Sequence, residues 1–146
     1  MERYNPIKIE EKWQKIWEEQ QTFKAKEDGR DKMFLAEMFP YPSGAGLHVG
    51  HVRNFSIVDV LARFYSQNGK NVLRPFGYDT FGLPAENYAI KTGISPKDAT
   101  KTNIQNFRKQ AKRLGYYIDW TRELNTSDPE YYRWTQWCFL QLYKKG

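Results

Sequence analysis

The sequence contains two histidines, and they stand three residues apart. His48 and His51 are expected in the first turn of a helix, where this spacing places both imidazoles on one face. An imidazole can donate hydrogen bonds to phosphate oxygens as negative charge builds up during an in-line displacement at phosphorus. The pair therefore predicts chemistry on a phosphate ligand. Two alternatives remain open: structural histidines, and a metal site, which the lack of further ligands at matching spacing disfavours.

The histidines end a segment rich in glycine and proline that runs from Pro40 to His51. An apolar run, Met33 to Phe39, precedes it and a helical pattern beginning at Val52 follows, so the segment is expected to turn from a strand into a helix. In a doubly wound α/β fold such a turn binds nucleotides, because the helix points unpaired N–H groups and its positive dipole end at phosphates. Three glycines let the backbone come close to a ligand. These are Gly44, Gly46 and Gly50.

A second strand is expected from Asn71 to Phe76, after a helix that stops at Asn68 and Gly69. Parallel strands joined by a helix end at the same edge of the sheet, so Asp79 is expected near the histidines. Its carboxylate could hold an ammonium group there. Aspartate between glycines is also common turn chemistry, and both interpretations remain open. The pattern as a whole predicts an α/β fold with a Rossmann-like parallel sheet.

Local composition predicts the helices at both ends of the chain. Asn5 and Pro6 open a surface helix that packs through two tryptophans, and Asp128 with Pro129 opens a last helix that is apolar on more than one side. The last helix is expected between layers or against an absent partner, with Cys138 as a small core residue. Five Trp, ten Tyr and nine Phe argue against disorder. The lack of a signal-peptide shape and of a membrane-length apolar run predicts a cytoplasmic protein.

The net charge of +6 is concentrated in one predicted helix, which Ser95 and Pro96 begin. Seven basic residues and one acidic residue lie between Lys91 and Leu114. The helix is expected to bury Ile104, Phe107, Ala111 and Leu114 and to project a basic arc on other faces. This arc is expected to meet RNA phosphates or to be solvated surface. Its members are Lys97, Lys101, Arg108, Lys109, Lys112 and Arg113.

Several motifs together resemble one enzyme family. Leu47-His48-Val49-Gly50-His51 resembles the His-Ile-Gly-His signature of class I aminoacyl-tRNA synthetases, with valine in place of isoleucine. The flanking segments resemble the leucine-specific members of bacterial type, and the likeness covers nearly the whole chain. They are Met38 to Gly44, Gly77 to Asn87, Asp119 to Leu124, Pro129 to Trp134 and Leu142 to Gly146.

The resemblance implies that the chain takes part in activating leucine with ATP and in transferring it to tRNA(Leu). The catalytic residues would be His48 and His51, which stabilise the phosphates in the transition state. Mg²⁺ would arrive with ATP, and neither a protein metal site nor a tightly bound cofactor is expected. The implied leucine-binding residues are Met38, Phe39, Tyr41 and Asp79. The implied ATP-binding residues are Pro40, Tyr41, Pro42, Ser43, Gly44, Leu47, His48, Gly50, His51 and, more weakly, Asn54. The arc residues assigned to tRNA are Lys109, Lys112 and Arg113.

The sequence also departs from the family pattern. Tyr78 stands where the family usually has Trp, and Thr80 where it usually has Ala, which leaves the fine shape of the leucine pocket open. The family's Lys-Met-Ser-Lys-Ser loop, editing domain and anticodon-binding domain are not found. We therefore expect an N-terminal helix and connector (1–32) and the first half of the catalytic domain (33–146), completed in cis or in trans by the rest of a monomeric enzyme. The alternatives are a synthetase-derived RNA-binding module without catalysis and another nucleotidyltransferase with the same signature.

Overall fold

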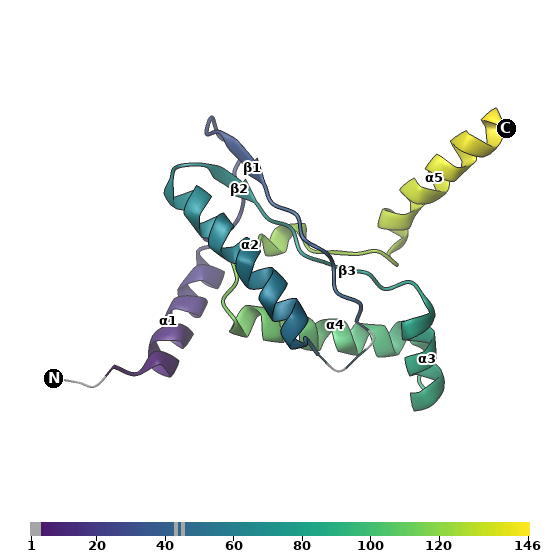
Figure 1. Ribbon diagram of the computed structural model, residues 1–146, viewed down its shortest axis with the longest axis horizontal. Coiled ribbons are helices and arrows are strands. Elements are labelled where there is room, and N and C mark those ends of the chain that lie inside the picture. Colours follow the sequence, from purple (N-terminus) through teal and green to yellow (C-terminus); the bar gives the residue numbers. More distant parts are fainter. Residues whose placement is uncertain (1–3, 43, 45) are drawn as a thin grey trace.

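The computed structural model describes residues 4–42, 44 and 46–146, and among these it is a mixed α/β structure (Figure 1). The first half of the chain alternates strand and helix, as the sequence pattern predicts. In chain order the elements are α1 (Pro6–Glu19), β1 (Lys32–Phe34), α2 (Val49–Gln67), β2 (Asn71–Leu73), β3 (Gly77–Tyr78), α3 (Leu83–Thr92), α4 (Pro96–Arg113), η1 (Trp120–Arg122), β4 (Leu124–Asn125) and α5 (Pro129–Lys145).

The described strands form two parallel pairs, β1 with β2 and β3 with β4. Both expected strands are shorter than predicted. The Leu35 amide still donates to the Leu73 carbonyl (3.0 Å), but the next residue that would have to donate back to the first strand is Pro75, which lacks an N–H. After β2 the chain also changes partner: the Arg74 carbonyl accepts from the Asp119 amide (2.9 Å) rather than from the β1 segment. The extended segment from β2 to β3 thus belongs to both strand pairs and connects them.

The predicted caps of the first and fourth helices are confirmed. The side chain of Asn5 accepts from the Lys8 amide and that of Ser95 from the Asp98 amide, and a proline follows each cap. Asp128 occupies the cap position of α5, as predicted, without a side-chain hydrogen bond to the helix. Short-range chemistry therefore determines where these helices begin.

The core lies between α2, α4 and the strands (Figure 1). Phe55 from α2 and Phe107 from α4 are both 1% exposed or less and pack with Phe76 and Tyr78. The apolar stripe predicted for α4 is confirmed at Phe107 and Ala111, and α2 buries Phe55 and Ala62. The prediction for Leu114 is wrong, because it is the C-cap of α4 and is 47% exposed.

A buried arginine connects the strands to α2. Arg74 is fully buried and donates to Glu37 Oε1 (2.6 Å from Nη2), to Asp59 Oδ1 (3.2 Å) and to the Phe55 carbonyl (3.0 Å). Burial raises the pKa of Glu37 although the arginine opposes the change. Because Glu37 directly precedes Met38 and Phe39, this ion pair holds the segment after β1 that leads into these two residues.

Helix α5 extends away from the rest of the molecule (Figure 1) and none of its residues is buried. The prediction of Cys138 as a core residue is wrong, since its side chain is exposed. An apolar helix surface becomes a core only where another element covers it, and the described part of the chain does not cover this one. The large exposed apolar residues of α5 are Tyr131, Trp134, Trp137, Phe139, Leu140, Leu142 and Tyr143.

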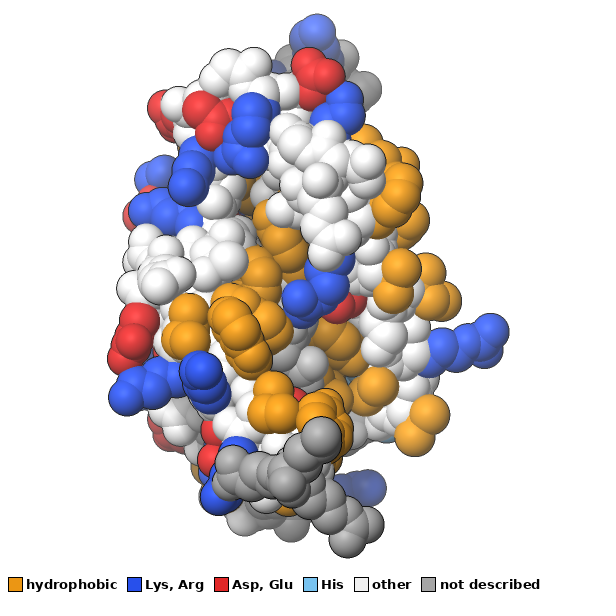
Figure 2. All heavy atoms as spheres, turned by 90° about the vertical axis from the view of Figure 1, so that its left-hand side faces the viewer, with side chains coloured by type: hydrophobic (Ala, Val, Ile, Leu, Met, Phe, Trp, Pro, Cys, Tyr) orange, Lys and Arg blue, Asp and Glu red, His pale blue; other side chains and the backbone are white. Residues whose placement is uncertain are grey.

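Exposed apolar side chains are not confined to α5. They also gather on the face at the opposite side of the molecule, with Lys and Arg side chains around them (Figure 2). Trp13 of α1 is 46% exposed, so of the two tryptophans predicted to anchor this helix Trp17 packs better, with its ring 5.2 Å from that of Phe23. None of the helices among the described residues combines the length and apolar composition needed to cross a bilayer.

Candidate active site

The two histidines form the start of α2. Helix α2 begins at Val49 with His48 as its N-cap, three residues before the predicted start at Val52. His48 Nδ1 accepts from the His51 amide (3.3 Å), and His51 Nδ1 accepts from the His48 amide (3.2 Å). The two rings stack with their centroids 3.7 Å apart. Each side chain thus satisfies an N–H that the helix start would leave unpaired.

This arrangement determines which ring nitrogens are available. Because both Nδ1 atoms accept hydrogen bonds, a neutral ring carries its proton on Nε2, which can donate to an anion. Burial and, to a smaller extent, His48 lower the pKa of His51. The rings of Phe55 and Phe107 lie behind His51, at 5.8 and 6.0 Å between centroids. Each ring can therefore donate from Nε2 at a helix N-terminus that itself favours anions.

The described residues among the remaining ones predicted to bind ATP precede α2 in the chain or belong to it. A Cβ on Gly50 would come within 2.9 Å of the His48 ring, so glycine is needed for the ring to fold over the helix. Pro40 and Pro42 are buried, Tyr41 is exposed, and Gly44, Leu47 and Asn54 are half-buried. Ser43 lies outside the described residues. We call the described residues from Pro40 to His51 the signature loop.

The four residues predicted to bind leucine line one cavity of about 450 Å³. Met38, Phe39 and Tyr41 come from the segment after β1, and Asp79 comes from the end of β3. The Asp79 amide donates to the Pro40 carbonyl (3.0 Å), which joins the two segments, and Thr126 Oγ1 donates weakly to its carboxylate (3.4 Å). The cavity thus combines aromatic and apolar walls with one carboxylate.

The sequence did not indicate the opposite wall of this cavity. It consists of Phe81 after β3, Thr126 after β4 and side chains from the first turns of α5. Their place depends on the pairing of β3 with β4 and on the direction of α5, which no local pattern reports. These residues are Phe81, Thr126, Tyr131, Tyr132 and Thr135.

Tyr78 and Thr80, which depart from the family pattern, both bond to the β4 segment. The buried Tyr78 hydroxyl donates to Glu123 Oε1 (2.7 Å), and burial together with this carboxylate raises the pKa of Tyr78. Thr80 Oγ1 donates to Asn125 Oδ1 (2.5 Å) and accepts from the Ser127 amide (3.0 Å). The two hydroxyls therefore reinforce the β3–β4 pair directly behind Asp79.

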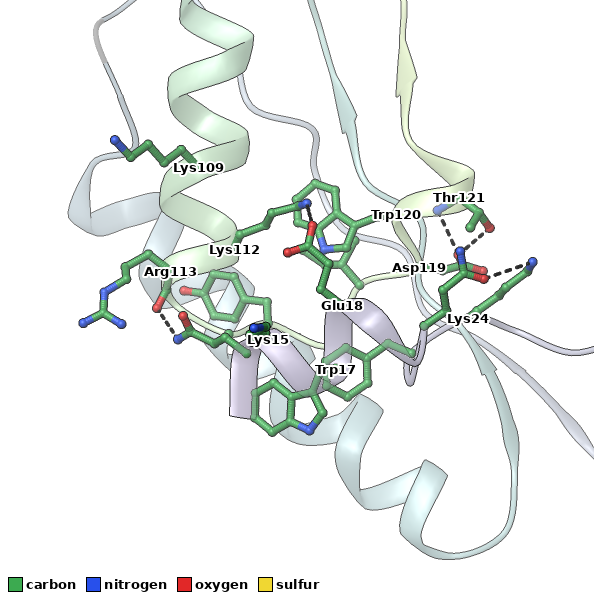
Figure 3. A pocket seen from close by; sticks show the side chains of 16 residues that line it. Lys15, Trp17, Glu18, Lys24, Lys109, Lys112, Arg113, Asp119, Trp120 and Thr121 are labelled. Atoms are coloured by element: carbon green, nitrogen blue, oxygen red, sulfur yellow. Dashed lines mark hydrogen bonds and ion pairs between the residues drawn. The ribbon is translucent and has the colours of Figure 1, made fainter. Parts of the chain in front are cut away.

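The basic residues assigned to tRNA lie at the C-terminal end of α4, where a cavity of about 630 Å³ separates it from α1 (Figure 3). Lys112 pairs with Glu18 of α1 and lies over the Trp120 ring, and Arg113 is 3.9 Å from Glu10. Arg108 forms a forked pair with Glu123. The structure gives Lys109 no ion pair within the described residues. The arc is thus partly neutralised by carboxylates of the same chain.

The described residues include no group of three or more His, Cys, Asp or Glu side chains that could hold a metal ion. The donors at the signature loop are ring and backbone N–H groups, which suit phosphate oxygens rather than a cation.

The chain is similar to known proteins both in sequence and in structure. The family model of tRNA synthetases class I (I, L, M and V) matches residues 12–146. The agnB2 LeuRS of Agrobacterium radiobacter K84, solved as a ternary LeuRS-tRNA-LeuAMS complex, superposes with a TM-score of 0.92 and 41% sequence identity over 99% of this chain. The present chain spans 18% of that LeuRS chain. It belongs to the family of class I tRNA synthetases that comprises the I, L, M and V enzymes.

Proposed function

We propose that this chain is the part of a leucine-tRNA ligase that binds leucine and ATP. The ligase would convert leucine and ATP to leucyl-adenylate and pyrophosphate and then transfer leucine to the terminal ribose of tRNA(Leu). The observation that carries the proposal is the cavity where Met38, Phe39, Tyr41 and Asp79 meet. The 41% identity to a LeuRS supports leucine as the amino acid.

Asp79 would bind the ammonium group of leucine. Its carboxylate lies at the end of β3 and is half-buried, where an ion pair with a ligand is screened less than on an open surface. Met38, Phe39 and Tyr41 would contact the aliphatic side chain. Because one methylene in such a pocket changes binding by only about 1 to 3 kcal/mol, these walls alone separate leucine modestly from its near-isosteres.

The signature loop would bind ATP. A leucine carboxylate oxygen would attack the α-phosphorus, the bond from that phosphorus to the bridging oxygen would break, and pyrophosphate would leave. The Nε2–H groups of His48 and His51 would donate to phosphate oxygens as their charge increases. Gly50 would let the nucleotide lie against the backbone. Mg²⁺ would arrive with ATP and offset phosphate charge, so positioning and charge stabilisation would supply the catalysis.

The proposed partners are the rest of the enzyme and tRNA(Leu). The exposed apolar side chains of α5 favour contact with another protein surface, which the remaining part of the enzyme would provide in cis or in trans. Lys109, Lys112 and Arg113 are proposed to contact tRNA phosphates, with Lys109 the most available. The last two would exchange their carboxylate partners on α1 for phosphate.

Amino-acid-dependent ATP–pyrophosphate exchange tests the proposal. It is measured for all twenty amino acids, with this chain alone and with the remaining part of the enzyme added. We expect leucine-specific exchange that His48→Ala and Asp79→Ala each reduce by at least a hundredfold, because one loses a phosphate donor and the other the ammonium partner. Asp31→Ala is the matched control, since Asp31 is an exposed carboxylate paired with Lys70 outside the cavity.

Exchange that depends on another amino acid would contradict the leucine assignment. If the completed enzyme shows no exchange while the chain binds tRNA, the RNA-binding alternative would replace the proposal. If exchange with ATP needs an acceptor other than an amino acid, the nucleotidyltransferase alternative would replace it.

A further inference from the structure

Helix α4 holds the signature loop through side chains on a single face. Asn103, Phe107 and Gln110 follow one another at spacings of four and three residues, so they lie in line along the helix. Asn103 Nδ2 donates to the Pro42 carbonyl (2.8 Å), and the asparagine is only 3% exposed. Gln110 Oε1 accepts from the Leu47 amide (2.7 Å). Two backbone groups of the loop are thus satisfied by one helix.

The positions of these contacts explain why they matter. Pro42 lies near the start of the loop, and Leu47 directly precedes the His48 cap of α2. Between these two contacts Phe107 packs its ring edge against His51, with 6.0 Å between centroids. A Cβ on Gly46 would come within 2.5 Å of the Gln110 amide, so glycine lets the loop lie directly on this side chain. The loop is fixed at both ends and supported below the histidines.

We propose that Asn103 and Gln110 are positioning residues that hold the signature loop in the shape that binds ATP. They act through the loop backbone, and neither lines the cavity that contains Asp79. Their loss therefore weakens ATP binding and leaves leucine binding nearly unchanged. The proposal rests on the proposed function for its consequence in catalysis, whereas its structural part concerns the loop alone.

The first test measures amide hydrogen exchange at Leu47 and in the core of α2. The variants Gln110→Met and Asn103→Leu remove the polar contacts and keep much of the side-chain volume. Gln110 is exposed, so its replacement spares the core and the fold. We expect the Leu47 amide to exchange at least tenfold faster in Gln110→Met, with α2 unchanged around Phe55. Gln110→Glu keeps the acceptor and should restore slow exchange. The matched controls are Gln105→Met and Asn106→Leu, both exposed on α4.

The second test measures the KM values for ATP and leucine in pyrophosphate exchange by the completed enzyme. We expect the KM for ATP to rise about tenfold in Gln110→Met and Asn103→Leu, and the KM for leucine to change less than twofold. Unchanged exchange at Leu47 in Gln110→Met would overturn the positioning role, and so would an equal rise of both KM values. Absence of leucine-dependent activity in the unsubstituted enzyme would count against the proposed function, whereas hydrogen exchange at Leu47 would still decide whether α4 holds the loop.

Discussion

Helices α4 and α5 begin with the same kind of cap but differ in how deeply their side chains are buried. Each starts with a capping residue followed by proline, and they contain 18 and 17 residues. Five residues of α4 are buried and none of α5 is, although α5 carries more aromatic and aliphatic side chains. Burial therefore does not follow the apolar content of a helix.

The difference lies in what each helix meets. The few apolar residues of α4 repeat on one face, and that face matches a core formed by α2 and the strands. Helix α5 presents apolar side chains on several faces, and apart from Tyr132, whose ring packs against Phe81, the described residues leave its large apolar side chains exposed. The difference indicates that α4 stabilises the folded chain, whereas α5 is suited to contact another protein surface.

The largest expected effect is on the free energy of unfolding, and it tests the contrast between α4 and α5 directly. Phe107→Ala should lower the free energy of unfolding by about 3 to 5 kcal/mol, because it leaves a cavity under the histidines. Trp137→Ala on α5 should change it by no more than about 0.5 kcal/mol, because the side chain is 55% exposed. Urea denaturation of both variants measures the contrast. Equal losses would mean that α5 is covered in solution by another copy or by the chain itself.

Tyrosine hydroxyls offer a second, smaller contrast. Tyr78→Phe should cost about 1.5 to 3 kcal/mol, because the buried hydroxyl donates to the Glu123 carboxylate. Tyr143→Phe on α5 is the matched control and should be neutral, since Tyr143 is 76% exposed. Thermal unfolding of the two variants compares them. A stable Tyr78→Phe protein would show that the forked pair of Arg108 satisfies Glu123 by itself.

The ion pair between α1 and α4 should contribute still less. Glu18→Gln is expected to change stability by about 0 to 1 kcal/mol, because 67% of the Glu18 side chain and 38% of the Lys112 side chain are open to solvent. The same change frees Lys112, so tRNA binding should become tighter at low salt and show a steeper salt dependence. Glu19→Gln provides the control, since its partner Lys15 lies on α1 itself. Unchanged tRNA binding would assign Lys112 to the packing of α1.

The smallest expected effect is the pH dependence contributed by His51, because its half-exposed ring is screened by solvent. Its folded-state pKa is lowered, so the folded protein binds the proton less readily than the unfolded chain does. The contribution is fully present above pH 6.5, the ordinary value, and is lost as the pH falls through the lowered folded pKa. An NMR titration should place the His51 midpoint below 6.5, and His51→Gln should flatten the stability profile in this range. A midpoint at or above 6.5 would contradict this prediction.

Sequence reasoning succeeded where the cause is local. The caps at Asn5 and Ser95 depend on residues within one turn. The resemblance named four residues that line one cavity in the structure, and their role in binding leucine stays a prediction. Predictions from the sequence failed where the structure depends on residues far away in the chain or on an uncommon capping residue. The start of α2 was misplaced because a histidine caps it, and Cys138 was misplaced because burial depends on covering elements. The α5 wall of the cavity requires strand pairing that no short pattern reports.

The parallel pairing of the strands has a consequence for the order in which this chain takes shape. Strand β1 meets β2 once α2 has been made, whereas β3 must wait for α3, α4 and β4 before it pairs. Because long loops close at an entropic cost, the β1–α2–β2 unit is expected to form first, during synthesis as well as during refolding. The histidines thus exist on a formed helix before α4 arrives with Asn103 and Gln110. The signature loop receives its contacts from α4 late, so a nascent chain is expected to carry the signature residues well before the loop is held in place.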